Sequence, residues 1–350
     1  MIQENSAVYE DFVFGELPVS VEAIQDHIQR FFPQNMEKGS WIQAILLKTA
    51  MGFIRRLSVN AAWNLGTFIG KSLYFFKLRS NVAFVNLDIV YGDTKSASEK
   101  TEIYKASLKN FGHVIVNYLR LPFAGEAFWA NHCELTNEEV LKTAINRKKG
   151  VLFVGGHIGM WDMAGGKVGM SGYPTSVVAK KIGNPVINRF VADARSSMNM
   201  GQIANKNTMA RILESLKRGE AIVLAIDENM KKERGVFVDW MGKPASSVKS
   251  TAYIAKKSGA AVVPGFMIQK GPDTFQVILG EELAWLDCPE DLEQELLMNT
   301  QNQARAVQEI ILQYPELWFW IHKRWKIRPE GEENPYEGNR RKKAGKSVEK

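Results

Sequence analysis

The segment from Val151 to Asp162 constrains the fold of this chain more than any other. It reads Val-Leu-Phe-Val-Gly-Gly-His-Ile-Gly-Met-Trp-Asp, four apolar residues followed by two glycines. A short apolar run of this kind is typical of a strand buried in a parallel sheet. The glycines end the strand, so we expect His157 just beyond its carboxyl end, where α/β proteins usually bind ligands.

His157 is followed five positions later by Asp162, and an imidazole with a carboxylate nearby suits general-base chemistry. In the predicted arrangement the carboxylate accepts the Nδ1 proton and fixes the tautomer. Nε2 is then free to take a proton from a hydroxyl group. The alternative is a purely structural histidine at a strand end, with Asp162 as the N-cap of the following helix.

Strand and helix patterns alternate along the chain beyond residue 150. The predicted strands cover 150–154, 173–180, 221–226, 261–269 and 275–279. The predicted helices cover 162–170, 185–191, 207–218, 246–258 and 289–313. The last two strands form a hairpin, and Pro264 is expected on an edge strand or at a bulge. The pattern predicts an α/β fold with a mostly parallel central sheet flanked by helices.

The predicted domain organisation is an N-terminal extension (1–40), one large body (41–329) and a basic, disordered tail (330–350). We expect one helix in the extension, over residues 21–32, and no secretory signal. Residues 41–80 predict two basic, aromatic-rich amphipathic helices, and two further helices follow to residue 121. The amphipathic pair would either lie in a membrane interface or cover the sheet. No stretch approaches the ~20 apolar residues that a transmembrane helix needs.

The charge balance indicates an acidic partner, since the formal net charge is +7. A nucleic acid, an anionic membrane surface or an acidic carrier protein would suit it. Nucleic acid is not favoured, because zinc-site and aromatic RNA-binding motifs are missing. Cys133 and Cys288 fit neither a zinc site nor a disulfide framework, so we expect a reducing compartment, no metal and no cofactor.

Four further charged residues are candidates for substrate binding. Lys180, Lys181 and Arg195 could bind phosphates of an acceptor or the phosphopantetheine of a donor, or they could be ordinary exposed cations. Asp227 follows an apolar run and could line the same cleft as His157, or it could cap a turn.

Several motifs carry a family resemblance over residues 42–329. Besides the His157 segment they are Val178-Ala-Lys-Lys-x-x-Asn-Pro, then Leu216-Lys-Arg-Gly…Asp227, Gly235-Val-Phe-Val…Gly242-Lys-Pro-Ala, and Pro315-Glu-Leu-Trp-Phe-Trp-Ile-His-Lys-Arg-Trp-Lys-x-Arg-Pro. With these the chain resembles the bacterial lipid A lauroyl/myristoyl acyltransferases and the related phosphatidylinositol mannoside acyltransferases. Many lipid A members have Glu where this chain has Asp162.

The last motif contains three tryptophans, Trp318, Trp320 and Trp325. They would lie at the headgroup level of a membrane or in the core. His322, in the same motif, is interpreted as structural.

The resemblance implies an O-acyltransferase that moves a fatty acyl chain from an acyl-carrier-protein or CoA thioester to a hydroxyl of a lipid A precursor or related glycolipid. His157 would be the base, oriented by Asp162, in peripheral or monotopic attachment to the cytoplasmic face of the inner membrane. The chain has no Gly-x-Ser-x-Gly elbow, which agrees with direct transfer. The alternatives are a phospholipid or aminolipid acceptor, a thioester hydrolase, or a non-catalytic binding protein.

Overall fold

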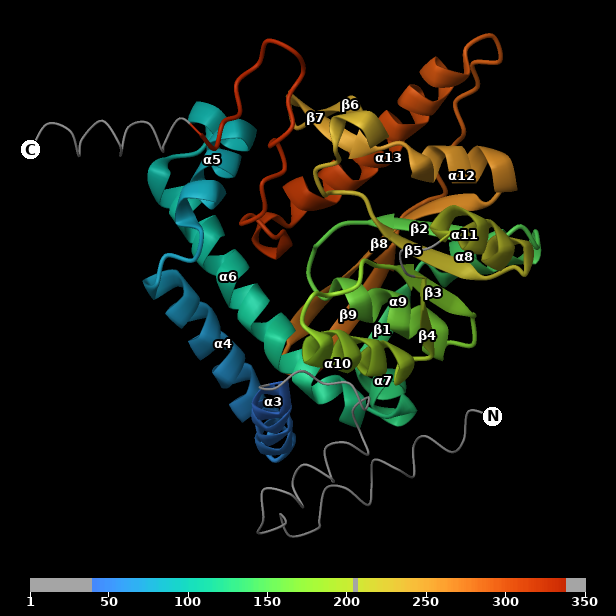
Figure 1. Ribbon diagram of the computed structural model, residues 1–350. Coiled ribbons are helices and arrows are strands. Elements are labelled where there is room, and N and C mark those ends of the chain that lie inside the picture. Colours follow the sequence, from blue (N-terminus) through green and yellow to red (C-terminus); the bar gives the residue numbers. More distant parts are fainter. Residues whose placement is uncertain (1–39, 204–206, 338–350) are drawn as a thin grey trace, which may run out of the picture.

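The computed structural model describes residues 40–203 and 207–337 (Figure 1). The predicted extension, except for Ser40, and its helix at 21–32 therefore lie outside the described residues. A seven-stranded sheet forms the centre, in the order β1-β9-β8-β2-β5-β3-β4. Its strands are β1 (Cys133–Thr136), β2 (Val151–Gly155), β3 (Thr175–Val178), β4 (Met200–Ile203), β5 (Ala221–Ala225), β8 (Ala261–Gly271) and β9 (Thr274–Leu279). Among the described strands of this sheet, only β8 and β9 pair antiparallel, so the predicted α/β class with a mostly parallel sheet is confirmed.

Helices cover both faces of the sheet, and the side chains of each strand alternate between two separate cores. On β2, Val151 and Phe153 belong to one core, and Leu152 and Val154 to the other. The first core packs under α7 (Glu126–His132), α8 (Glu138–Asn146), α9 (Trp161–Met170) and α10 (Pro185–Ser196). The second packs under α11 (Thr208–Lys217), α12 (Ser250–Ser258) and α13 (Leu292–Gln313). The uninterrupted apolar run of β2 follows from this burial on both sides.

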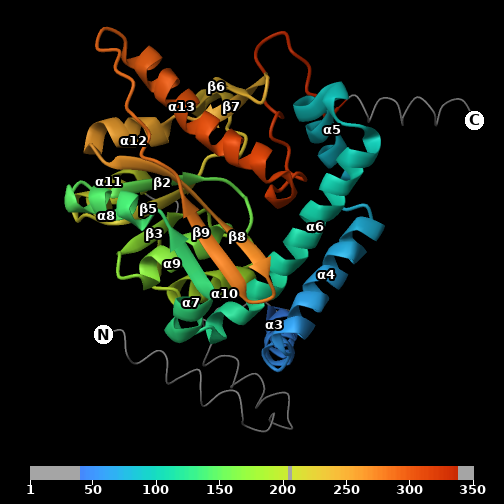
Figure 2. The same ribbon diagram turned by 180° about the vertical axis from the view of Figure 1, so that it is seen from behind.

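The N-terminal helices form an arm along one side of the sheet (Figures 1 and 2). They are α3 (Ser40–Arg55), α4 (Val59–Phe75), α5 (Ser80–Tyr91) and the long α6 (Ala97–Arg120). Ser96 and Glu99 start α6 with a reciprocal capping box. The α4 and α6 backbones touch, since a methyl group on Gly112 would collide with the backbone oxygen of Gly66. The two amphipathic helices predicted within residues 41–80 correspond to α3 and α4.

Several details of the fold differ from the sequence prediction. The predicted helix 246–258 begins only at Ser250, because residues up to Val248 form β7 (Lys243–Val248), which pairs with β6 (Gly235–Trp240) in a separate hairpin. Pro264 lies on an inner strand, at the residue where β8 leaves β2 and passes to β9. The short strands β1 and β4 were not predicted, because their sequences, Cys-Glu-Leu-Thr and Met-Gly-Gln-Ile, contain no continuous apolar run.

The segment after α13 folds back into the molecule. Trp318, Trp320 and Trp325 are fully buried, so of their two predicted placements the structure has the core. Tyr336 is buried as well, and its hydroxyl donates to Asn86 Oδ1 at 2.5 Å. Tyr336 thus packs against the body, while residues 330–333 and Glu337 are exposed.

Candidate active site

The site is built where two neighbouring parallel strands end. In the β2–β5 register Gly155 pairs with Ala225, so two residues further on His157 and Asp227 stand at the same level. His157 Nδ1 lies 2.9 Å from Asp227 Oδ1, and the backbone N–H of His157 donates to Asp227 Oδ2 at 2.8 Å. A carboxylate only accepts hydrogen bonds, so Nδ1 carries the proton. In the neutral imidazole this tautomer leaves the lone pair on Nε2.

Asp227 is fully buried and is held from several sides. Its carboxylate packs so close to Gly156 that a Cβ there would come within 2.9 Å of the carboxyl carbon. Trp318 Nε1 donates to Oδ2 at 2.9 Å. On the backbone side, His322 Nε2 lies 3.1 Å from the carbonyl oxygen of Asp227. The carboxylate is thereby locked in one orientation toward the imidazole.

The charges of this pair shift each other's protonation. Burial lowers the pKa of His157, but the negative charge of Asp227 and its hydrogen bond outweigh burial and raise the pKa to about 8. Burial also opposes ionisation of Asp227, yet His157 and its other partners hold the pKa of that carboxyl well below its usual range. Asp227 is therefore ionised at neutral pH, and His157 is an unusually strong base for an imidazole.

The predicted partner of His157 was Asp162, and here the structure differs. Asp162 is the second residue of α9, and its side chain is buried. Arg195 Nη2 donates to Asp162 Oδ2 at 2.9 Å. The hydroxyl of Tyr118 also donates to Asp162 Oδ2. Gly159, with φ of +56°, turns the chain between the histidine and α9. Asp162 therefore faces α6 and α10, and Asp227 is the carboxylate that lies next to His157 Nδ1. Burial raises the pKa of the Asp162 carboxyl, and Arg195 works against that shift.

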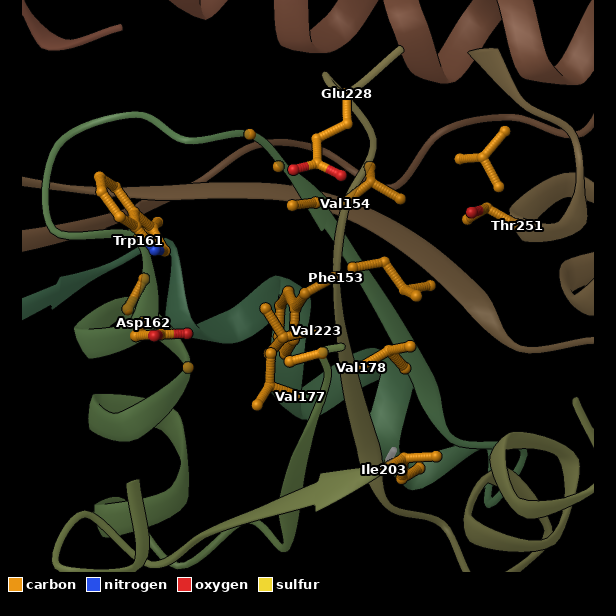
Figure 3. A pocket seen from close by; sticks show the side chains of 18 of the residues that line it. Phe153, Val154, Trp161, Asp162, Val177, Val178, Ile203, Val223, Glu228 and Thr251 are labelled. Atoms are coloured by element: carbon orange, nitrogen blue, oxygen red, sulfur yellow. The ribbon is translucent and has the colours of Figure 1, made fainter. Parts of the chain in front are cut away.

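A cavity of about 730 Å³ opens beside the pair (Figure 3). Both His157 and Asp162 line it, and so does Trp161, whose ring lies edge-on to the imidazole with centroids 5.3 Å apart. Most of the other lining residues are apolar and come from β2, β3, β5, α9, α11 and α12. About 27% of the His157 side chain is exposed, so a substrate in the cavity can reach it.

The four predicted substrate-binding residues have different positions. Lys180 lies at the cavity mouth, 84% exposed, with Nζ 3.8 Å from Glu228. Lys181 is exposed and is not among the cavity residues. Arg195 lines the cavity, but its guanidinium is bonded to Asp162 and, through Nη1, to Gln202 Oε1 at 2.9 Å. Asp227 is brought directly to His157.

Residues of the C-terminal segment support the site, and the sequence did not assign them this position. Trp318 and His322 contact Asp227 directly. Arg324 is fully buried, lies 4.1 Å from the centroid of the Trp240 ring, and donates to the backbone oxygens of Glu228 and Ser246. It joins the loop after β5 to the β6–β7 hairpin. The dense run of tryptophan and basic residues at 318–325 was the available signal, but it pointed equally to a membrane interface.

A histidine open to an apolar cavity and backed by a buried aspartate, at the carboxyl edge of an α/β sheet, is an arrangement expected of an enzyme for apolar substrates. The sequence profile of the family described as "Bacterial lipid A biosynthesis acyltransferase" matches residues 30–327. The chain belongs to this family and is an acyltransferase.

Characterised relatives agree with that assignment. The lipid A biosynthesis lauroyltransferase of Escherichia coli is 27% identical, over 78% of this chain and 88% of the relative. The lipid A biosynthesis palmitoleoyltransferase of the same species is 24% identical, over 78% and 87%. The phosphatidylinositol mannoside acyltransferase of Mycobacterium tuberculosis is 25% identical, over 63% and 69%. The names of these relatives give different acyl chains and different acceptors.

Proposed function

We propose that this acyltransferase moves a fatty acyl chain from an acyl-carrier-protein or CoA thioester to a hydroxyl of a lipid A precursor or a related glycolipid. The observation that carries the proposal is the His157–Asp227 pair beside a large, mostly apolar cavity. A cavity of about 730 Å³ lies within the ~300–1,000 Å³ range of small-molecule sites. Because the lining is mostly apolar, the cavity suits a hydrocarbon chain better than it suits a water-soluble substrate, which would need polar contacts.

In the proposed mechanism His157 Nε2 takes the proton of the acceptor hydroxyl as the oxygen attacks the thioester carbonyl. The new C–O bond forms, the C–S bond breaks, and the imidazolium returns its proton to the departing thiolate. Asp227 holds the Nδ1–H tautomer and stabilises the imidazolium, as the aspartate of a Ser-His-Asp triad does. Asp162 and Arg195 shape the adjoining wall of the cavity rather than exchange the proton.

The test is acyl transfer by the purified protein with a carrier-protein or CoA thioester and a mixture of acceptors. We expect mass spectrometry to find the lipid A precursor heavier by one acyl group. Acylation of a phospholipid or an aminolipid instead would support the alternative acceptors. Release of free fatty acid with no acylated lipid would support the thioester hydrolase and contradict the proposal.

We also propose that the enzyme attaches peripherally to the cytoplasmic face of the inner membrane through α3 and α4. Leu46 and Phe53 on α3, and Phe68 and Phe75 on α4, are 59–77% exposed and stand seven residues apart in each helix, on one face. Exposed basic side chains flank this face, among them Arg56, Lys71 and Lys77. Among the helices of the described residues, none combines the length and hydrophobicity needed to span a bilayer.

Replacing both Phe68 and Phe75 with Asp should strongly reduce sedimentation with anionic lipid vesicles. Each exposed phenylalanine that enters the interface contributes roughly 1.5–3 kcal/mol, about tenfold or more in binding. The matched control is Leu312→Asp on α13, a residue that is 50% exposed but lies outside the proposed face. High salt should weaken binding of the wild type. Equal sedimentation of all three proteins would reject this attachment.

A further inference from the structure

The cavity reaches both faces of the central sheet. Adjacent residues on a strand point to opposite faces, yet both members of such pairs line the cavity on three neighbouring strands. The pairs are Phe153 and Val154 on β2, Val177 and Val178 on β3, and Val223 and Leu224 on β5. In each pair the first residue belongs to the core under α9 and the second to the core under α11 and α12.

Two apolar branches therefore meet at the strand ends. The α9 branch is lined by Phe153, Val177 and Val223 together with Ala164 and Gly165 of α9. The α12 branch is lined by the second members of the three pairs, with Ile203, Ile212, Thr251 and Ile254. In Figure 3 the labelled residues of the α9 branch gather on the side of Asp162, and Val178, Ile203 and Thr251 lie on the other side.

The sheet opens where the branches join. The pairing of β3 with β5 ends at Val177 and Val223, so the last residues of β5 have no partner on that side. On the other side of β2, pairing with β8 ends at Pro264. His157 stands just beyond this opening and lines the same cavity. A group bound in either branch can therefore present its end to the imidazole.

The surroundings distinguish the two branches. The α9 branch lies beside α10, and α10 contacts the proposed membrane helix α3, with Asn184 donating to Gln43 at 2.7 Å. The cavity mouth carries the basic side chains of Lys180 and Arg234. In Figure 1, α11 and α12 lie on the side of the sheet away from α3 and α4. By its place beside α10 and α3, the α9 branch suits a lipid from the bilayer, and the α12 branch suits a soluble, acidic donor.

We propose that the cavity binds two hydrocarbon chains at once, the acyl chain of the thioester donor in the α12 branch and an acyl chain of the acceptor lipid in the α9 branch. This proposal rests on the acyl transfer proposed above and adds where each substrate lies. Occupation of separate branches brings the thioester and the acceptor hydroxyl together only at His157. The depth of the α12 branch then sets the preferred donor chain length.

Val177→Phe and Val178→Phe form a matched pair of tests, because the same change on adjacent residues fills opposite branches. Binding is measured with S-alkyl phosphopantetheine thioethers of increasing alkyl length, which carry the donor chain but cannot transfer it. We expect Val178→Phe to weaken binding of the longest chain relative to the shortest by on the order of tenfold, since one excess methylene alone costs about that much. Val177→Phe should leave the length dependence unchanged.

Transfer assays on the same variants complete the test. We expect Val177→Phe to raise the KM of the acceptor lipid severalfold without changing the preferred donor length. The opposite assignment, or an equal shift of donor length in both variants, would overturn the proposal. If the two Phe variants do not fold, Val177→Leu and Val178→Leu give the same comparison with a smaller added side chain. If the wild type binds the thioethers but transfers no acyl chain, the proposed function is contradicted. The thioether binding of the two variants still shows which branch holds the donor chain.

Discussion

Replacing His157 with alanine is expected to abolish acyl transfer. General-base catalysis by a positioned side chain contributes about 10²–10⁴-fold to a rate, and His157 is the residue proposed to supply it. The cavity and the Asp162–Arg195 ion pair do not depend on its side chain, so substrate binding should persist. Initial rates with a radiolabelled acyl thioester measure the loss.

In the alanine variant the buried carboxylate of Asp227 loses its partner, and His157→Gln controls for this effect. Removing one partner of a buried ion pair costs about 3–5 kcal/mol, because the other charge loses its compensation. A glutamine amide can still donate to Asp227 but cannot act as a base. We expect His157→Gln to remain folded in thermal unfolding and to be as inactive as the alanine variant. Full activity in either folded variant would reject His157 as the base.

Asp227→Asn should reduce kcat/KM severely, by about 10²–10⁴-fold. The amide has nearly the shape of the carboxylate, but it can donate to Nδ1 and so stabilise the wrong tautomer, with the proton on Nε2. In a serine protease triad the same substitution costs about 10⁴-fold in kcat. It also removes the negative charge that raises the pKa of His157 to about 8. Steady-state kinetics with saturating thioester measure the effect.

Asp162→Asn is the comparison variant, and we expect it to lower the rate of acyl transfer for a different reason. Asp162 lines the cavity and neutralises Arg195, whose side chain is only 10% exposed. Its loss leaves a buried guanidinium without a carboxylate, which should lower thermal stability and disturb the α9 wall. The His157–Asp227 pair stays intact, so the ionisation of the base should not change.

Local sequence pattern predicts part of this site and not the rest. The strand, the two glycines and the position of His157 at a strand end follow from twelve consecutive residues. The partner of the imidazole does not, because it depends on β5 lying next to β2, and that pairing joins residues seventy positions apart. Asp162 is near His157 in sequence, but Gly159 and the start of α9 carry it toward Arg195.

The supporting residues were harder to predict for a similar reason. Trp318 and His322 come from a segment that follows α13, and only the folded chain places them against Asp227. A run of tryptophan and basic residues is compatible with a membrane interface as well as with a core. The two branches of the cavity could not be predicted either, since they require the register at which β3 and β5 separate.

The pH dependence of kcat/KM in the wild type, Asp227→Asn and Asp162→Asn tests the central claim most directly. A histidine acts as a base only when neutral, so the rate of the wild type should rise with pH through about 8, the pKa of His157. Asp227→Asn should move this midpoint to lower pH, because the charge that raises the pKa is gone, and Asp162→Asn should leave it near that of the wild type. A midpoint that shifts in Asp162→Asn and stays in Asp227→Asn would contradict the assignment of Asp227 as the residue that orients His157.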